Sequence, residues 1–168
     1  MNVIIAGVVP NSIVDGPGLR YTLFVQGCPH KCKGCHNQHT WDFAGGKMMD
    51  IDQIFTQIKY DVLLSGITFS GGEPFCQARP LVELARKVHS IGLSVVTYTG
   101  FKIEELIRMA KTNDPIKDLL LETDILIDGP FIEEEKSLEL KFRGSKNQRI
   151  IDCQKTWQQG KIILMEDI

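Results

Sequence analysis

Three closely spaced cysteines are the residues in this chain best suited to chemistry. Cys28, Cys32 and Cys35 lie in one short loop with the spacing C-x3-C-x2-C. Iron–sulfur cubanes are normally held by cysteine thiolates, one for each iron. A set of three cysteines therefore indicates a cluster with one iron left open for a small-molecule ligand. Sites with an open position are typical of catalytic centres, whereas closed four-ligand sites are usually structural.

Two other interpretations of this loop stay open at this point. A structural zinc site is one, because His36 and His39 follow Cys35 and a set of three cysteines and one histidine suits zinc. A disulfide is the other, although three cysteines cannot all pair. A chain of 168 residues with 43% hydrophobic content can bury a core without a metal staple. We therefore favour the open iron–sulfur site.

Composition limits the classes of partner. The formal net charge is −2, so no basic excess indicates nucleic acid, and no apolar stretch approaches the roughly 20 residues that span a membrane. The first residues carry no Lys or Arg before a short apolar run, so we expect no signal peptide. Five cysteines in an acidic chain without a leader fit a reducing cytoplasm. The length predicts a single domain over residues 1–168.

The segments that must position the cysteines alternate between strand and helix patterns. Apolar and β-branched runs predict strands at 21–26, 66–69, 93–98, 124–127, 149–151 and 162–165. Apolar residues at helical spacing predict helices at 51–60, 81–88 and 103–110. Strands about thirty residues apart, with helices between them, imply a parallel sheet covered by helices. Because a closed eight-stranded barrel usually takes about 250 residues, we expect an α/β fold of the incomplete, open parallel βα barrel type.

The unusual residues fall where predicted strands end. The cysteine loop directly follows the strand at 21–26, and residues 70–73, 97–100 and 128–129 follow later strands. In α/β sheets and barrels, ligands bind at the carboxyl ends of the strands. In the run at 70–73, Gly71 and Gly72 would let a ligand approach the backbone closely, because no Cβ stands in the way. The Glu73 carboxylate is able to accept a hydrogen bond from an ammonium group of a ligand. Taken alone, however, a Gly-Gly-Glu-Pro run is usually an ordinary turn.

The cysteine loop and the Gly-Gly-Glu-Pro run at 71–74 together resemble the radical S-adenosylmethionine (SAM) superfamily. They are its two principal motifs, and they stand here in the expected order and at the expected distance. In that superfamily three cysteines hold a 4Fe-4S cluster, and SAM chelates the fourth iron through its amino and carboxylate groups. The resemblance therefore implies one such cluster per chain, with Cys28, Cys32 and Cys35 as its ligands and SAM as a second cofactor.

Further runs are similar to the glycyl-radical-enzyme activases, namely residues 12–20, 35–37 and 40–41. Residues 127–131 and 143–149 are most similar to the activating proteins of anaerobic (class III) ribonucleoside-triphosphate reductases. The resemblance implies an oxidoreductase in which a reduced cluster cleaves SAM and the resulting 5′-deoxyadenosyl radical takes a hydrogen atom from a glycine of the reductase. It also implies a flavodoxin- or ferredoxin-type electron donor. The alternatives are an activase of another glycyl radical enzyme, such as pyruvate formate-lyase, and a non-catalytic zinc-binding interaction module.

The same resemblance indicates where SAM binds. We expect SAM contacts at Gly34, Cys35, His36, Ser70, Gly71, Gly72, Glu73, Pro74, Thr97 and Asp128. For Thr97 the alternative is a hydroxyl that caps a helix, and for Asp128 it is an Asx-type turn. Gly34 departs from the superfamily pattern, which often has an aromatic or large apolar residue there to pack on adenine. The adenine contact must then come from elsewhere, with His36 or the neighbouring backbone as candidates.

Other polar residues are expected to have structural roles. Asp15 and Arg20 should form an ion pair that braces the first strand. His30 should be a loop or surface residue rather than a metal ligand. Cys76 and Cys153 should be small, buried and inert thiols.

Overall fold

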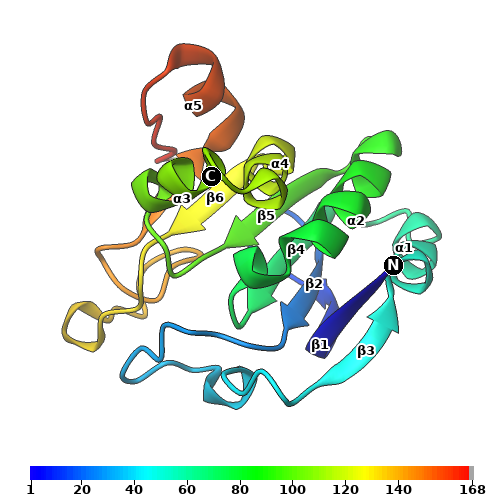
Figure 1. Cartoon of the computed structure of the whole chain (residues 1–168), viewed down its shortest axis with the longest axis horizontal. Coiled ribbons are helices and arrows are strands. Elements are labelled where there is room, and N and C mark those ends of the chain that lie inside the picture. The colour runs from blue at the N-terminus through cyan, green and yellow to red at the C-terminus, as the bar shows by residue number, and fades with distance from the viewer. Residues whose placement is uncertain (167–168) are drawn as a thin grey trace.

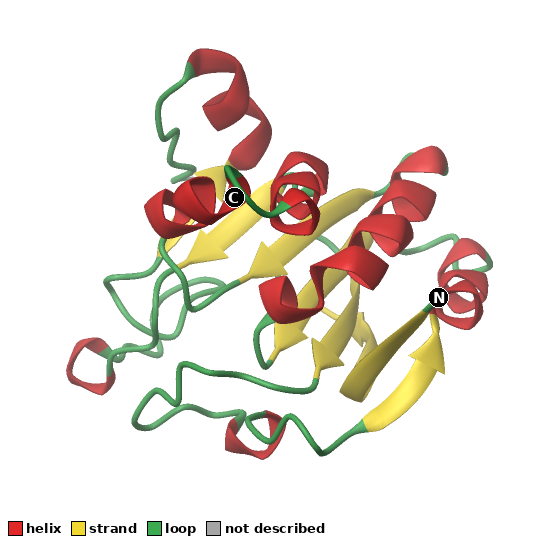
Figure 2. Ribbon diagram, in the orientation of Figure 1, coloured by secondary structure: helices red, strands yellow, loops and turns green. Residues whose placement is uncertain are grey.

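The computed structural model describes residues 1–166, and the strands in that range form one mixed sheet of seven strands. Their order across the sheet is β3-β1-β2-β4-β5-β6-β7, and Figure 2 shows the sheet with helices packed against it. The strands are β1 Asn2–Ser12, β2 Arg20–Val25, β3 Lys47–Asp50, β4 Gly66–Gly71, β5 Ser94–Tyr98, β6 Ile125–Asp128 and β7 Arg149–Asp152.

The sheet is parallel only in its centre. Strands β2, β4, β5 and β6 run parallel to one another, as the alternating pattern predicts. The prediction of a parallel sheet is wrong at both flanks, because β1 is antiparallel to β2 and β3, and β7 is antiparallel to β6. A parallel pair needs a crossover, usually a helix. No α-helix separates β1 from β2 or β6 from β7 within the described residues, so each of these pairs is antiparallel.

Helices cover one face of the sheet. They are α1 Ile51–Lys59, α2 Ala78–Ser90, α3 Ile103–Ala110, α4 Asp114–Glu122 and α5 Cys153–Gln159, and Figure 1 shows α1 to α4 on the same side of the strands. The three predicted helices are confirmed. Within residues 1–166, no helix has both the length and the apolar content needed to cross a membrane.

Some elements were not predicted. Asn113 caps the start of helix α4, since its side-chain oxygen accepts from the Ile116 N–H at 3.2 Å. The following Asp-Pro is a helix-start signal that the apolar pattern alone does not show. Strands β1 and β3 and helix α5 were also missed. The strand predicted at 162–165 is wrong, since this segment makes only an isolated bridge between Leu164 and Ile151.

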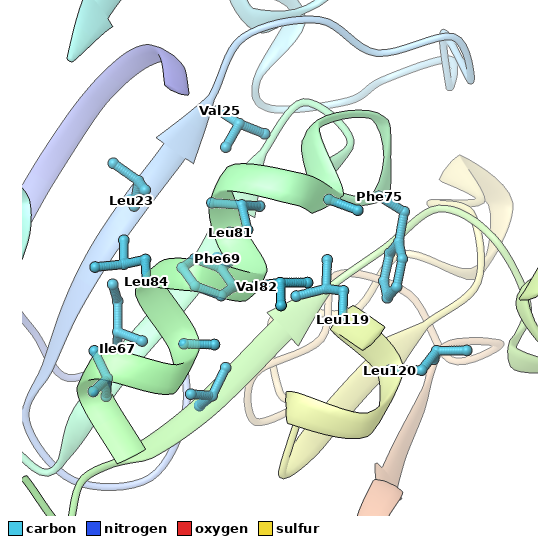
Figure 3. Close-up of a cluster of buried hydrophobic side chains, with 14 of the residues drawn as sticks. Leu23, Val25, Ile67, Phe69, Phe75, Leu81, Val82, Leu84, Leu119 and Leu120 are labelled. Atoms are coloured by element: carbon cyan, nitrogen blue, oxygen red, sulfur yellow. The ribbon is translucent and has the colours of Figure 1, made fainter. Parts of the chain in front are cut away.

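The main core lies between the helices and the sheet face beneath them. In Figure 3, Leu81 and Leu84 of α2 point toward Ile67 and Phe69 of β4. These four side chains are fully buried, and each such apolar side chain stabilises the fold by roughly 1.5–3 kcal/mol. The spacing of three residues between the two leucines places both on one side of the helix. We call this side of the strands the helical face.

The other face of the strands carries different side chains. Because successive residues on a strand point to opposite faces, Thr68 and Ser70 of β4 lie on the face away from α2. Val96 belongs to a second, smaller apolar cluster, against which Tyr98 packs. This second face is not covered by α1 to α4 (Figure 1), so it is available for a binding site.

A buried arginine, Arg20, lies against the face of the sheet that points away from α2. The Arg20 guanidinium donates to Thr68 Oγ1 at 2.8 Å and to the Ser94 carbonyl at 3.0 Å. The predicted ion pair between Asp15 and Arg20 is wrong, because Asp15 instead accepts from Ser12 Oγ at 2.5 Å. Burial lowers the pKa of Arg20 to about 10. Arg20 therefore fixes the amino-terminal ends of β4 and β5 through neutral oxygens.

Candidate metal and cofactor site

The cysteine loop, residues 27–37, begins at the carboxyl end of β2. Its backbone takes left-handed conformations at Gly27, Lys31 and Gly34, with φ of 102°, 50° and 78°. Such values are common for glycine but rare for lysine. Together with a hydrogen bond from the Cys35 N–H to the Cys32 carbonyl at 3.1 Å, these turns bend the loop back on itself. In Figure 1 it runs below the tips of the central strands.

The three loop thiols differ in exposure. Cys28 is buried, whereas Cys32 and Cys35 are half-buried, and all three are free. Burial is the main reason why the pKa of both Cys28 and Cys32 lies above the usual value for a thiol. A bound cation reverses this effect, because a coordinating thiol is deprotonated by the metal.

Backbone N–H groups face the loop sulfurs. The Asn37 N–H donates to Cys35 Sγ at 3.4 Å. The amide of His30 lowers the pKa of Cys28 through a hydrogen bond, and the amide of Phe131 does the same for Cys32. Hydrogen bonds to sulfur are one of the features by which proteins tune iron–sulfur clusters.

Sulfur donors on one loop, each facing backbone N–H groups, fit an iron–sulfur cluster. Within residues 1–166, no group of three or more His, Cys, Asp or Glu side chains is arranged to hold a single metal ion.

A second segment, residues 131–133, contacts the cysteine loop. It follows β6, which lies next to the edge strand β7. The Phe131 ring contacts His36 with ring centroids 5.7 Å apart, and Glu133 pairs with Lys33 at 3.8 Å. A Cβ added at Gly34 would lie 3.1 Å from the Glu133 carboxyl carbon. The Glu133 side chain therefore occupies the space next to Gly34, which gives a physical reason for the absence of a large residue there.

A cavity of about 1010 Å³ opens on the face of the sheet opposite the helices. We call this face the cavity face. Its lining includes Cys35 and His36 from the cysteine loop, Ser70 from β4, Tyr98 from β5 and Phe131. Ligand sites usually have volumes of about 300–1,000 Å³, so this space is sufficient for a nucleoside-sized molecule. Three of the residues expected to contact SAM, namely Cys35, His36 and Ser70, line it.

Two other expected residues point elsewhere. The Thr97 hydroxyl bonds to Thr123 Oγ1 at 2.9 Å on the helical face. The Asp128 carboxylate is fully buried and accepts from the Ile103 N–H at 2.8 Å and from Arg149 Nε at 3.0 Å. Both residues therefore have structural partners in this conformation, and neither lines the cavity.

The glycines of the Gly-Gly-Glu-Pro run face the neighbouring strand. A Cβ at Gly71, where φ is 97°, would lie 2.6 Å from the Val25 nitrogen, and a Cβ at Gly72 would overlap the Gly27 carbonyl oxygen. The Gly72 N–H donates to the Val25 carbonyl at 2.9 Å. In this structure the glycines thus allow a close approach between β4 and the start of the cysteine loop.

Glu73 and Pro74 complete the same turn. The Glu73 side chain is fully buried and caps a short 3-10 helix by accepting from the Phe75 N–H at 3.0 Å. Pro74 is the first residue of that helix, where a missing N–H costs nothing. Glu73 is not among the described residues that line the cavity.

Sequence reasoning missed several cavity residues. Tyr98 donates its hydroxyl to the Phe142 carbonyl at 2.6 Å, and burial raises the pKa of Tyr98. Phe142 has a φ of 62°, which is unusual for a bulky residue. The alternation of strand residues between faces could have predicted the position of Tyr98. Thr97 and Tyr98 are neighbours on one strand, so they cannot both face the cavity.

One expectation about another residue also needs correction. Cys76 is exposed rather than buried, although its surroundings raise its pKa to about 11, mainly by desolvation. His30 lies in the loop, as expected, with a side chain that is 16% exposed and bonds to Glu73. Cys153 is buried as expected, and burial raises its pKa to about 12.

A family model described as a 4Fe-4S single cluster domain matches residues 14–151. The fold, the sulfur donors and this match define an iron–sulfur protein, and they favour a cluster over the zinc site that the sequence left open.

Curated relatives identify the family more specifically. The chain is 36% identical over 149 residues to the anaerobic ribonucleoside-triphosphate reductase-activating protein of Haemophilus influenzae, covering 84% of this chain and 92% of that protein. It is 37% identical over 150 residues to the protein of that name from Vibrio cholerae, with the same coverage. The protein of that name from Enterobacteria phage T4 is 31% identical over 153 residues, covering 85% and 90%. This chain belongs to the family of anaerobic ribonucleoside-triphosphate reductase-activating proteins.

A solved structure of QueE from Escherichia coli aligns with 60% of this chain and 53% of that chain, with a TM-score of 0.45 and 19% identity. That likeness is too low to support a conclusion about fold or activity.

Proposed function

We propose that this protein is a radical SAM oxidoreductase that activates an anaerobic ribonucleoside-triphosphate reductase by generating a glycyl radical on it. The observation that carries the proposal is the position of the three-cysteine loop, whose third cysteine lines a nucleoside-sized cavity at the carboxyl ends of the strands. When bound, a 4Fe-4S cluster and SAM supply reductive cleavage of SAM and hydrogen abstraction from a glycine. The protein itself supplies position and electrostatics.

The cysteine loop would hold one cluster through Cys28, Cys32 and Cys35. The amides that face these sulfurs would stabilise the ligated thiolates. Phe131 contacts His36 of the loop and lines the cavity, where its ring would limit the access of water. Exclusion of water from a cluster is one of the features that set its potential.

The cavity next to Cys35 would hold SAM. His36 and Ser70 line it, and the backbone at Gly34, Gly71 and Gly72 borders the same strand ends. Thr97 and Asp128, which the resemblance places in the SAM site, are engaged elsewhere, so we give them structural roles. Phe131 and His36 would flank the adenine, because Gly34 has no side chain to do so.

The partner would enter from the uncovered side of the sheet. The order of strands ends at β3 and β7, which is compatible with an open βα barrel of the radical SAM type in which only the central strands are parallel. Ile13, Val14 and Leu138 line the cavity and are 74%, 68% and 90% exposed. Exposed apolar residues beside a site suit contact with another protein. We propose that a glycine-bearing loop of the reductase binds there.

Several further features belong to the same proposal. Residues 1–168 act as a single radical SAM domain, in the cytoplasm, with a flavodoxin- or ferredoxin-type protein as electron donor. Neither nucleic acid nor a membrane is needed for this activity.

The decisive test begins with anaerobic reconstitution using iron and sulfide. We expect about four irons per chain, the number in the proposed cluster, and 5′-deoxyadenosine release from SAM under dithionite. A glycine-centred EPR signal should appear on addition of an anaerobic reductase, but not with pyruvate formate-lyase. Cys32→Ser should abolish all three results. Cys76→Ser is the matched control, since Cys76 lies outside the loop and should leave them unchanged.

Other results would contradict the proposal. One zinc per chain, without a brown chromophore or SAM cleavage, would support the interaction module instead. A radical on pyruvate formate-lyase alone would reassign the partner.

A further inference from the structure

One histidine of the cysteine loop is inserted between two other strand ends. His30 lies between Cys28 and Cys32 in sequence, and its ring contacts Phe101 edge-on with ring centroids 4.5 Å apart. A Cβ added at Gly100 would overlap the His30 ring. The ring therefore occupies a slot whose wall, after β5, requires a residue without a side chain.

The floor of this slot is the Glu73 carboxylate. His30 Nε2 lies 2.7 Å from Glu73 Oε1, and the two side chains are 16% and 0% exposed. A carboxylate accepts hydrogen bonds and does not donate them, so Nε2 carries the proton in this contact. The remaining ring nitrogen is not part of the pair.

Glu73 is fully occupied by donors from this chain. Besides His30, it accepts from Thr99 Oγ1 at 2.9 Å, from the Gly100 N–H at 2.8 Å and from the Phe75 N–H at 3.0 Å. A buried carboxylate with this set of donors has little capacity left for another one. This arrangement differs from the sequence-based expectation that Glu73 accepts from an ammonium group of a ligand.

The pair connects three strand ends. His30 belongs to the loop after β2, Glu73 follows β4, and Thr99 and Gly100 follow β5. The Glu73 N–H also donates to the Gly27 carbonyl at 2.8 Å. The cysteine loop is thus tied to β4 by its first residue and to β4 and β5 by His30.

We propose that His30 and Glu73 are positioning residues, whose hydrogen bond fixes the cysteine loop so that Cys28 and Cys32 keep the spacing needed for the cluster. Neither residue is a metal ligand in this proposal. It rests on the proposed function, because positioning the thiols matters only if they hold a cluster. Partners that orient metal ligands typically contribute 10–100-fold to metal affinity.

The test compares loop order with overall stability in the protein before cluster loading. Under anaerobic conditions, N-ethylmaleimide labelling of Cys28 is followed by peptide mass spectrometry, with the buried Cys153 of α5 as an internal reference. In His30→Leu we expect Cys28 to react about tenfold faster, because loss of a hydrogen bond to a charged group favours local opening of the loop, while the rate at Cys153 is unchanged. His30→Gln keeps an N–H donor and should restore part of the protection.

A second variant reaches the slot without changing either partner. Gly100→Ala adds a Cβ where the His30 ring lies, so it should expose Cys28 as His30→Leu does. Gln38→Leu is the matched control, because Gln38 is an exposed residue of the following turn. In Gln38→Leu, N-ethylmaleimide should label Cys28 at the same rate as in the original protein.

Cluster retention gives the second measurement. After reconstitution, iron loss to a chelator should be about tenfold faster in His30→Leu and Gly100→Ala than in Gln38→Leu. Two results would overturn the proposal: a Cys28 rate in His30→Leu equal to that of the original protein, or equal acceleration at Cys28 and Cys153. If the unaltered chain holds no iron and cleaves no SAM, the proposed function fails instead, which is a different result from either of these.

Discussion

The helical face and the cavity face of the sheet are built from the same strands but carry different side chains. Along β4, Ile67 and Phe69 pack into the core under α2, whereas Ser70 lines the cavity. Along β5, Thr97 bonds to Thr123 on the helical side, whereas the next residue, Tyr98, lines the cavity. One residue of shift along a strand thus separates packing in the core from lining of the cavity.

Because the two faces carry different side chains, stability and chemistry should be separately alterable in this protein. Changes on the helical face should reduce the free energy of unfolding and leave the chemistry of the folded molecule intact. Changes at the strand ends and on the cavity face should alter the chemistry, with a smaller effect on the free energy of unfolding. Four experiments test this separation.

The largest effect on chemistry should come from Cys35→Ala. Cys35 lines the cavity and is half-buried. The loss of a thiolate should reduce 5′-deoxyadenosine production to the level without protein, as measured by chromatography. The free energy of unfolding of the chain before cluster loading should change by less than about 0.5 kcal/mol in urea. A large loss of stability there would show that the loop also supports the core.

The largest effect on stability should come from Leu84→Ala in α2. Leu84 is fully buried on the helical face, and truncation of such a residue costs about 2–5 kcal/mol. Urea unfolding monitored by circular dichroism should show this loss. SAM cleavage per reconstituted cluster should equal that of the original protein at a temperature where both are folded. A reduced rate would mean that the two faces are coupled.

A smaller and sharper test uses two neighbouring residues. Thr97→Val and Tyr98→Phe each remove one hydrogen bond, which contributes about 0.5–1.5 kcal/mol to stability. Only Tyr98→Phe should also raise the KM for SAM, because it releases Phe142 beside the cavity. Steady-state kinetics over a range of SAM concentrations separates the two. An increase in KM for Thr97→Val would return Thr97 to the SAM site.

The smallest effect concerns His89, at the end of α2. The hydrogen bond that the His89 ring donates to the Asp124 carboxylate is the main cause that raises the pKa of His89, and a second one donated to Glu122 adds to it. Because the folded pKa lies above the unfolded value of about 6.5, the contribution to stability is complete below pH 6.5. It is lost as the pH rises through the folded pKa.

His89→Gln should therefore weaken the fall in stability above pH 6.5, by at most about 1 kcal/mol for a partly exposed pair. Urea midpoints measured at several pH values check this. SAM cleavage should not change, since His89 is on the helical side. An unchanged pH dependence of stability would contradict the role of the two carboxylates.

The sequence predicts the local features of the site well. The spacing of the cysteines, the strand before them and the amphipathic pattern of α2 are encoded by neighbouring residues. The central parallel strands follow from the alternation of strands and helices. These features need only short-range patterns, and the structure contains each of them.

The features that sequence reasoning missed depend on contacts between distant residues. Glu73 looks like a ligand-binding carboxylate until its donors are known, and these come from residues 30, 75, 99 and 100. Asp15 and Arg20 are close in sequence, but Arg20 instead bonds to β4 and β5. The antiparallel flanks were missed because no periodic pattern shows the direction in which a strand returns to a sheet.

The contact between Phe131 and the cysteine loop has a consequence for how the protein is made. The loop leaves the ribosome roughly 100 residues before Phe131, which at about 5–20 residues per second corresponds to roughly 5–20 s. During that interval the sulfurs lack both the aromatic cover and the amide that faces Cys32. If the loop holds the proposed cluster, iron delivered to the nascent chain would meet a loop without these contacts, and maturation with iron and sulfide would follow synthesis of the last third of the chain.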